Sequence, residues 1–103
     1  MENITVEELK RRVDAGEKLH IVDVREPDEV AEFNIGATHI PLGNIMSFQL
    51  AELEDWKDEE VILHCKGGTR SMQAGMMLET MGFSNVKNLE GGMKAWQERI
   101  HKS

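Results

Sequence analysis

Two kinds of hydrophobic pattern alternate along the chain. The first is a short apolar run, rich in Val and Ile, which occurs at residues 18–26, 37–43, 60–65 and 85–89. Runs of this kind are typical of strands buried in a parallel sheet. The second repeats apolar residues at helical spacing, at residues 4–16, 27–33, 44–53, 71–83 and 91–100. The alternation predicts a single α/β domain over residues 1–103, in which strand and helix follow one another to the C-terminus.

Several of these helices carry recognisable end signals. Thr5 lies three residues before Glu8, the spacing of a capping box, and Gly16 follows as a stop. Pro27 suits a first helical turn. The helix that follows the run at 60–65 is expected to begin near Ser71.

That helix carries an unusual number of methionines, at positions 72, 76, 77 and 81. A flexible thioether surface can serve partner binding, but helical spacing favours core packing for most of these residues. Met72 is the exception, because it comes one residue after the segment "CKGGTRS" and can line the rim of a site there.

Composition places the chain among ordinary globular proteins, with 40% hydrophobic and 30% charged residues. No run approaches the roughly 18 consecutive apolar residues of a membrane span, and the polar start "MENITVEELKRR" lacks the apolar core of a signal peptide. We therefore expect a cytoplasmic protein with no membrane contact. The net charge of −7 argues against nucleic-acid binding, which relies on a basic surface.

The only cysteine, Cys65, lies in the segment "HCKGGTRS", just past an apolar run and just before a helical pattern. A lone cysteine is often an inert core residue, but a core residue would be expected inside the run. At this position the helix N-terminus and the glycine-rich backbone can stabilise a thiolate, with Lys66 and Arg70 adding positive charge that attracts a small anion. His64 points to the opposite face of its strand, so a structural role is favoured over that of a general base.

Four segments in this order resemble a single-domain rhodanese, a sulfurtransferase: "IVDVREPDEV", "FNIGATHIPL", "CKGGTRS" and "LEGGMKAW". The resemblance runs from about Thr5 to Trp96. It implies about five mostly parallel strands with helices on both faces, and a catalytic Cys65 that carries a persulfide. It also implies that Asp23 and Arg25 order the loop after their strand as an ion pair or hydrogen-bonded pair, and Trp96 is expected in the core.

The length of the cysteine loop separates this interpretation from its nearest alternative. Phosphatases of similar design place five residues between Cys and Arg, whereas four separate Cys65 from Arg70. The resemblance implies that the tighter ring holds one sulfur atom. Its backbone N–H groups would stabilise the persulfide, Lys66 and Arg70 would bind the donor, and Ser71 would bond the sulfur or cap the helix. The expected binding residues are Lys66, Gly67, Gly68, Thr69, Arg70 and Ser71.

The expected partners are a small anionic sulfur donor such as thiosulfate and a thiol, cyanide or protein acceptor, with no cofactor or metal ion. A phosphatase or arsenate reductase, and a catalytically weak module that recruits a partner, remain as alternatives. One departure from the family pattern bears on substrate preference. Where relatives often have "GHIPGA", this chain has Phe33, Asn34 and Ile35 before Gly36.

Overall fold

The computed structural model describes residues 1–101, and its centre is one sheet of five parallel strands. The strands follow the spatial order β1-β5-β4-β2-β3. Their bounds are β1 (Glu2–Ile4), β2 (His20–Asp23), β3 (Thr38–His39), β4 (Glu60–His64) and β5 (Asn85–Leu89). Every neighbouring pair is parallel, so all five carboxyl ends meet at one edge of the sheet.

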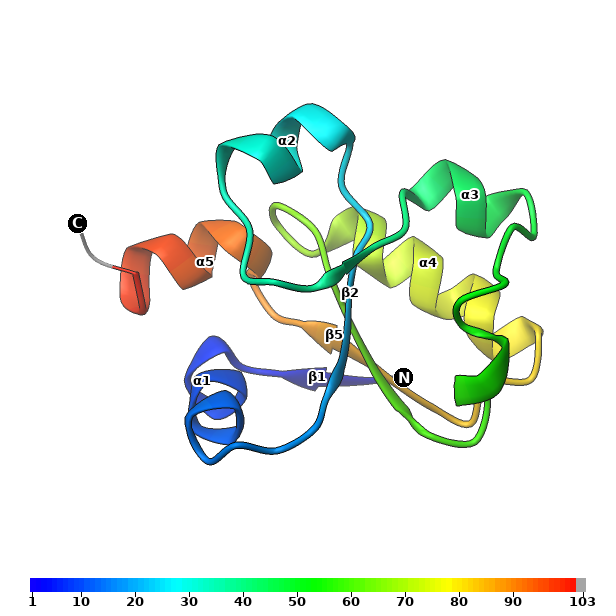
Figure 1. The fold of residues 1–103 in the computed structure, drawn as a ribbon, viewed down its shortest axis with the longest axis horizontal. Coiled ribbons are helices and arrows are strands. Elements are labelled where there is room, and N and C mark those ends of the chain that lie inside the picture. The colour runs from blue at the N-terminus through cyan, green and yellow to red at the C-terminus, as the bar shows by residue number, and fades with distance from the viewer. Residues whose placement is uncertain (102–103) are drawn as a thin grey trace.

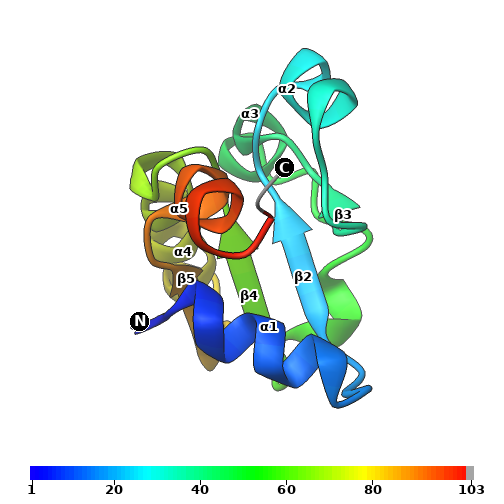
Figure 2. The ribbon, with the colours of Figure 1, turned by 90° about the vertical axis from the view of Figure 1, so that its left-hand side faces the viewer.

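Helices cover both faces of this sheet (Figures 1 and 2). Their bounds are α1 (Val6–Asp14), α2 (Pro27–Glu32), α3 (Leu42–Met46), α4 (Thr69–Thr80) and α5 (Gly92–Arg99), with a short 3-10 turn, η1 (Glu54–Trp56). Two of them, α1 and α5, contact each other on one face, and α3 contacts α4 on the other. The short helix α2 follows β2 beyond the carboxyl edge (Figure 1). The predicted α/β architecture is confirmed.

The alternation of side chains along β4 divides the core into two clusters. Val61, Leu63 and Cys65 belong to the cluster beneath α3 and α4, while Ile62 belongs to the cluster beneath α1 and α5. All four are buried, as expected for a central strand covered on both faces. Trp96 is buried in the second cluster, which confirms its predicted place in the core.

The N-terminal strand β1 was not predicted from the sequence pattern. Its three residues pair with β5, and only Ile4 is buried. A strand this short at the edge of a sheet leaves almost no periodic signal. At the start of α1, the Thr5 hydroxyl accepts the Glu8 N–H at 3.1 Å, but the Glu8 carboxylate pairs with Arg11, so only half of the predicted capping box forms.

Two further expectations about helices were wrong in part. A helix was predicted over residues 44–53, but α3 occupies Leu42–Met46 and η1 follows only at Glu54. Met76 was expected in the core, yet it is 59% exposed, whereas Met77 and Met81 pack against the first cluster as predicted. Since α4 covers the sheet with one face only, a helix with methionines on several faces must expose some of them. In residues 1–101, no helix is both long and apolar enough to cross a membrane.

Candidate active site

The cysteine loop connects the carboxyl end of β4 to the N-terminus of α4. Cys65 is the first residue after β4, and the helix begins at Thr69. Gly68 precedes it with a φ of +109°, a backbone conformation that a residue with a Cβ rarely adopts. This turn brings the helix start two residues earlier than predicted. Ser71 is therefore the third residue of α4, where its side chain points inward, and the expectation that it caps the helix was wrong.

The sulfur of Cys65 lies among hydrogen-bonding groups from this turn. The Gly68 N–H donates to Sγ at 3.0 Å, and the Ser71 hydroxyl lies 3.3 Å from it. Cys65 is 1% exposed, so these bonds form in a site from which water is almost excluded. Such an arrangement can stabilise an anion on sulfur.

The pKa of the Cys65 thiol reflects two opposing effects. Burial alone would raise this pKa, because it disfavours the charged thiolate. Hydrogen bonds from the Ser71 hydroxyl and from the backbone N–H groups of Ser71, Gly68 and Gly67 outweigh burial and lower the pKa below its ordinary value. The site therefore raises the fraction of the thiol that is ionised, and the thiolate is the nucleophilic form.

A second layer of polar groups holds Ser71 in place. Its hydroxyl donates to Asn88 Oδ1 at 2.5 Å, while Asn88 Nδ2 donates to the Gly68 carbonyl at 3.2 Å. Both side chains are buried. Asn88 on β5 thus fixes the hydroxyl and the turn that face Cys65.

The start of α5 fixes the other side of the loop. The Met93 N–H donates to the Cys65 carbonyl, and the Lys94 N–H donates to the Lys66 carbonyl, each at 2.9 Å. Gly92 lies next to them with a φ of +54°. A Cβ on Gly92 would overlap the Cys65 carbonyl oxygen and would lie 2.6 Å from that of Lys66. Glycine is therefore required where α5 meets the loop.

Arg70 is engaged by an acidic residue of α2. Its two terminal nitrogens donate to the two carboxylate oxygens of Glu29, at 2.6 and 2.8 Å. Mainly through these bonds, the Arg70 guanidinium lowers the pKa of Glu29 to about 2. The sequence predicted Arg70 at the site but not its carboxylate partner.

Lys66 differs from Arg70, because its side chain forms no ion pair within residues 1–101. It lines a small pocket of about 110 Å³ between the loop, α2 and α5, together with Glu29, Glu32 and Phe33. Phe33 is the first residue of the segment that departs from the family pattern, and it lines this pocket beside the cysteine loop. Lys66 and Gly67 are exposed, as is Thr69, whose side chain has no hydrogen bond to the sulfur among the described residues.

Asp23 and Arg25 form the expected ion pair, with Arg25 Nη2 2.8 Å from Asp23 Oδ2. The same nitrogen donates to the Phe33 carbonyl, so the pair secures the end of α2. His64 is completely buried 3.8 Å from Asp23, and neither ring nitrogen has a hydrogen-bond partner among the described residues. Burial lowers the pKa of His64 to about 4, and the Asp23 carboxylate opposes this shift only partly.

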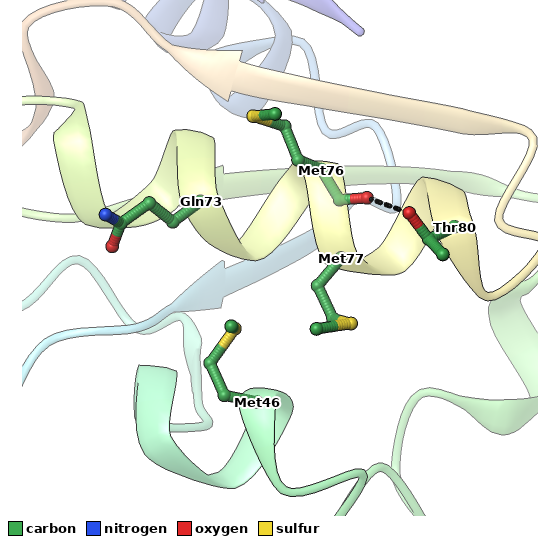
Figure 3. Close-up of a pocket in the computed structure, with 5 residues that line it drawn as sticks. All are labelled: Met46, Gln73, Met76, Met77 and Thr80. Atoms are coloured by element: carbon green, nitrogen blue, oxygen red, sulfur yellow. Dashed lines mark hydrogen bonds between the residues drawn. The ribbon is translucent and has the colours of Figure 1, made fainter.

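A larger hollow of about 390 Å³ lies elsewhere, between α3 and α4 (Figure 3). It is lined by Met46, Gln73, Met76, Met77 and Thr80. These lining residues include no nucleophilic cysteine and no charged group, and none of the predicted site residues is among them. The candidate site is therefore the cysteine loop, which borders the smaller pocket.

Three residues at the site were missed in the sequence. Asn88 left a faint signal, because it is a polar residue inside an otherwise apolar strand pattern. Gly92 is the second glycine of "EGGM". The two glycines indicate a turn, but they do not indicate that this turn packs against the cysteine loop. Glu29 left no local signal, since it lies 41 positions before Arg70 in the sequence and only the fold brings the two together.

Comparison with known proteins agrees with this geometry. The rhodanese-like domain family matches residues 5–99. "Putative sulfurtransferase YtwF" of Bacillus subtilis is 41% identical over 98 residues, covering 94% of this chain and 91% of that protein. The crystal structure of a rhodanese-like domain protein from Staphylococcus aureus superposes with a TM-score of 0.83 at 36% identity, covering 93% of this chain and 91% of that one.

A third similar protein bears on the phosphatase alternative. It is a Rhodopseudomonas palustris protein of unknown function, described as a possible tyrosine phosphatase, with a TM-score of 0.84 at 26% identity. The match covers 95% of this chain and 80% of that one.

The family match over nearly the whole chain, the identity to YtwF and the shared fold together show that this chain belongs to the rhodanese-like family.

Proposed function

We propose that the protein is a sulfurtransferase that moves a sulfane sulfur from thiosulfate or a persulfide donor to a thiophilic acceptor through a persulfide on Cys65. The observation that carries the proposal is the set of hydrogen bonds around Sγ. Gly68 and Ser71 contact the sulfur directly, and they lower the pKa of the thiol against the effect of burial. Membership of a family whose relatives are named sulfurtransferases supports the same chemistry.

In the first half-reaction, the Cys65 thiolate attacks the outer sulfur of the donor. A new S–S bond forms, the bond between the donor's two sulfur atoms breaks, and its electron pair leaves with sulfite when the donor is thiosulfate. The product is a Cys65 persulfide anion. The backbone N–H groups of Gly67, Gly68 and Ser71 are in place to stabilise part of this charge, because they already hydrogen-bond the sulfur of Cys65.

In the second half-reaction, a thiol, cyanide or a protein acceptor attacks the outer sulfur of the persulfide. The Cys65 thiolate leaves, and the same hydrogen bonds that stabilise it as a nucleophile also make it a good leaving group. No second cysteine is present to form an internal disulfide, so the sulfur must pass to an acceptor outside the chain. We propose that the protein acts in the cytoplasm, because thiols are kept reduced there.

The test is turnover of thiosulfate with cyanide as acceptor. The wild-type protein is expected to form thiocyanate, whereas Cys65→Ser and Cys65→Ala are expected to fold normally and to form none above the rate without protein. Circular dichroism confirms the fold of both variants. Substantial thiocyanate from either variant would refute the role of Cys65.

The same purified protein also tests the alternative that the chain is a phosphatase. A phosphatase uses a guanidinium to stabilise the charge that develops on the transferred phosphoryl group, but both terminal nitrogens of Arg70 are bonded to Glu29. We therefore expect no hydrolysis of aryl phosphates by the wild-type protein.

A further inference from the structure

We infer that Glu29 is a specificity-determining residue: by holding Arg70, it disfavours donors with an oxyanion next to the transferred sulfur and favours alkyl hydropersulfides, R–S–SH. The inference rests on the proposed sulfur transfer and narrows its donor class. One ion pair, between Arg70 and Glu29, lies at the mouth of the cysteine loop.

The pair uses the part of Arg70 that would otherwise recognise an oxyanion. A guanidinium binds sulfonate, phosphate or carboxylate groups best through two parallel N–H bonds. In this structure Nη1 and Nη2 of Arg70 already make two such bonds to the carboxylate of Glu29. The Nε–H side of the guanidinium can still offer N–H bonds to a donor, but the carboxylate of Glu29 neutralises the charge that would attract an oxyanion there.

Glu29 is also held by contacts that do not involve Arg70. Its Oε1 accepts the Glu26 N–H at 3.0 Å at the start of α2, and the Glu29 carbonyl lies 3.4 Å from Nη1 of Arg25. Arg25 in turn bonds Asp23 at the end of β2. The carboxylate is therefore anchored to the sheet through its own helix, and releasing Arg70 would leave a negative charge at the loop.

The net charge at the mouth follows from these contacts. Arg70 and Glu29 cancel, and the thiolate adds a negative charge, so Lys66 is the cation of the loop that remains for a donor. The small pocket beside Lys66 is also lined by Glu29, Glu32 and Arg25, and the charge of Arg25 is balanced by its ion pair with Asp23. Thiosulfate carries two negative charges and must approach all of these groups, which is unfavourable.

The storage of sulfur on Cys65 does not share this limitation. Its stabilising bonds come from Gly68, Ser71 and the loop backbone, and none of them involves the Arg70 side chain. When the donor is a hydropersulfide, the thiolate attacks the outer sulfur, the S–S bond of the donor breaks, and the leaving thiolate takes up the proton from that sulfur as R–SH. This exchange is balanced and requires no oxyanion site.

The experiment compares Glu29→Gln with Glu32→Gln. Both variants remove one negative charge from α2 and from the same pocket, but only the first alters the partner of Arg70. In Glu29→Gln the new amide oxygen can still accept the Glu26 N–H, so the helix start is kept. The donors are thiosulfate and 2-hydroxyethyl hydropersulfide, whose tail is uncharged, and the readout is the rate of sulfur loading on Cys65 as a function of donor concentration.

We expect Glu29→Gln to lower the KM for loading by thiosulfate, the donor concentration at half the maximal loading rate, about tenfold or more. The maximal loading rate with thiosulfate and the loading rate with the hydropersulfide should both stay within about twofold of wild type. Glu32→Gln should change the thiosulfate KM less than about threefold. Equal effects of the two variants, or a KM that rises in Glu29→Gln, would overturn the inference. A fall in loading by both donors would also overturn it, because it would assign Glu29 a structural role only.

A binding measurement keeps this inference separate from the proposed chemistry. In a Cys65→Ser background no sulfur can be transferred, and calorimetric titration reports thiosulfate affinity alone. Adding Glu29→Gln is expected to tighten binding at least about fivefold over the background, and adding Glu32→Gln is not. If wild-type Cys65 takes up sulfur from neither donor, the proposed function fails, while the titration still decides whether Glu29 excludes oxyanions; equal affinities in the two double variants would overturn that role.

Discussion

At the scale of single residues, the site depends on a hydroxyl that has more than one partner. Ser71 Oγ lies 3.3 Å from Sγ, 3.2 Å from the Gly68 carbonyl and 2.5 Å from Asn88 Oδ1, yet it carries one proton. With a neutral thiol, the hydroxyl can donate to Asn88 and accept from sulfur. With a thiolate, it can turn its proton to the sulfur, which is how it lowers the pKa of Cys65.

Replacing this hydroxyl gives a prediction with a pH signature. In Ser71→Ala the pKa of Cys65 should rise, so the acidic limb of the rate of sulfur loading against pH should move to higher pH. Stability should fall by about 1–3 kcal/mol, because the buried Asn88 oxygen loses its donor. The measurements are the pH–rate profile and urea unfolding.

The control for this variant is Thr69→Ala, which removes a hydroxyl two residues earlier, from an exposed side chain. Its profile should coincide with that of wild type. A Ser71→Ala profile that also coincides with wild type would contradict the role of Ser71 at the sulfur.

At the scale of elements, the loop is held by the ends of β4, α4 and α5, and the closest approach is at Gly92. The amides after Gly92 bond the carbonyls of Cys65 and Lys66, and no space is left for a Cβ. This contact lets the N-terminus of α5 fix the backbone that carries the nucleophile.

Gly92→Ala should therefore destabilise the protein by about 2–5 kcal/mol, the sum of a left-handed backbone and an overpacked contact. Gly16→Ala is the matched control, since Gly16 also has a positive φ, +78°, but a Cβ there would meet nothing within 4 Å. It should cost about 1–2 kcal/mol. Equal shifts of the two unfolding midpoints in urea would show that the contact with the loop contributes nothing.

The same elements show what the sequence could and could not predict. Four of the five strands, and the placing of Cys65 between β4 and α4, followed from apolar runs, because buried parallel strands are continuous in hydrophobicity. β1 was missed since it has one buried residue, and the start of α4 was misplaced because a positive φ at Gly68 leaves little trace in a pattern. The pairing of Arg70 with Glu29 exists only in the folded chain, so no spacing rule could reveal it.

At the scale of the whole molecule, a buried histidine of the sheet makes the stability of the fold depend on pH. His64 lies inside the protein, next to Asp23 and Arg25, and its pKa is lowered to about 4, mainly by burial. In the unfolded chain its pKa is about 6.5. Between these values the unfolded state binds a proton that the folded state does not, so stability must fall as the pH falls from about 6.5 toward 4.

The full effect of His64 is on the order of 3 kcal/mol, and part of it should be visible between about pH 7 and pH 5, where most carboxylates remain ionised. His64→Gln should lose less stability over this interval than wild type, by urea unfolding at both pH values. His101→Gln, which changes an exposed ring, should keep the wild-type loss. The same loss in His64→Gln and wild type would show that His64 is not the titrating group.

The proposed activity of the whole molecule requires that the cysteine loop carries sulfur. The most direct measurement is the intact mass of the protein after incubation with thiosulfate at a concentration high enough to saturate a weak site. We expect a gain of one sulfur atom that a thiol reductant removes, and no gain in Cys65→Ser. An unchanged mass in the wild-type protein, or the same gain in Cys65→Ser, would contradict a persulfide on Cys65.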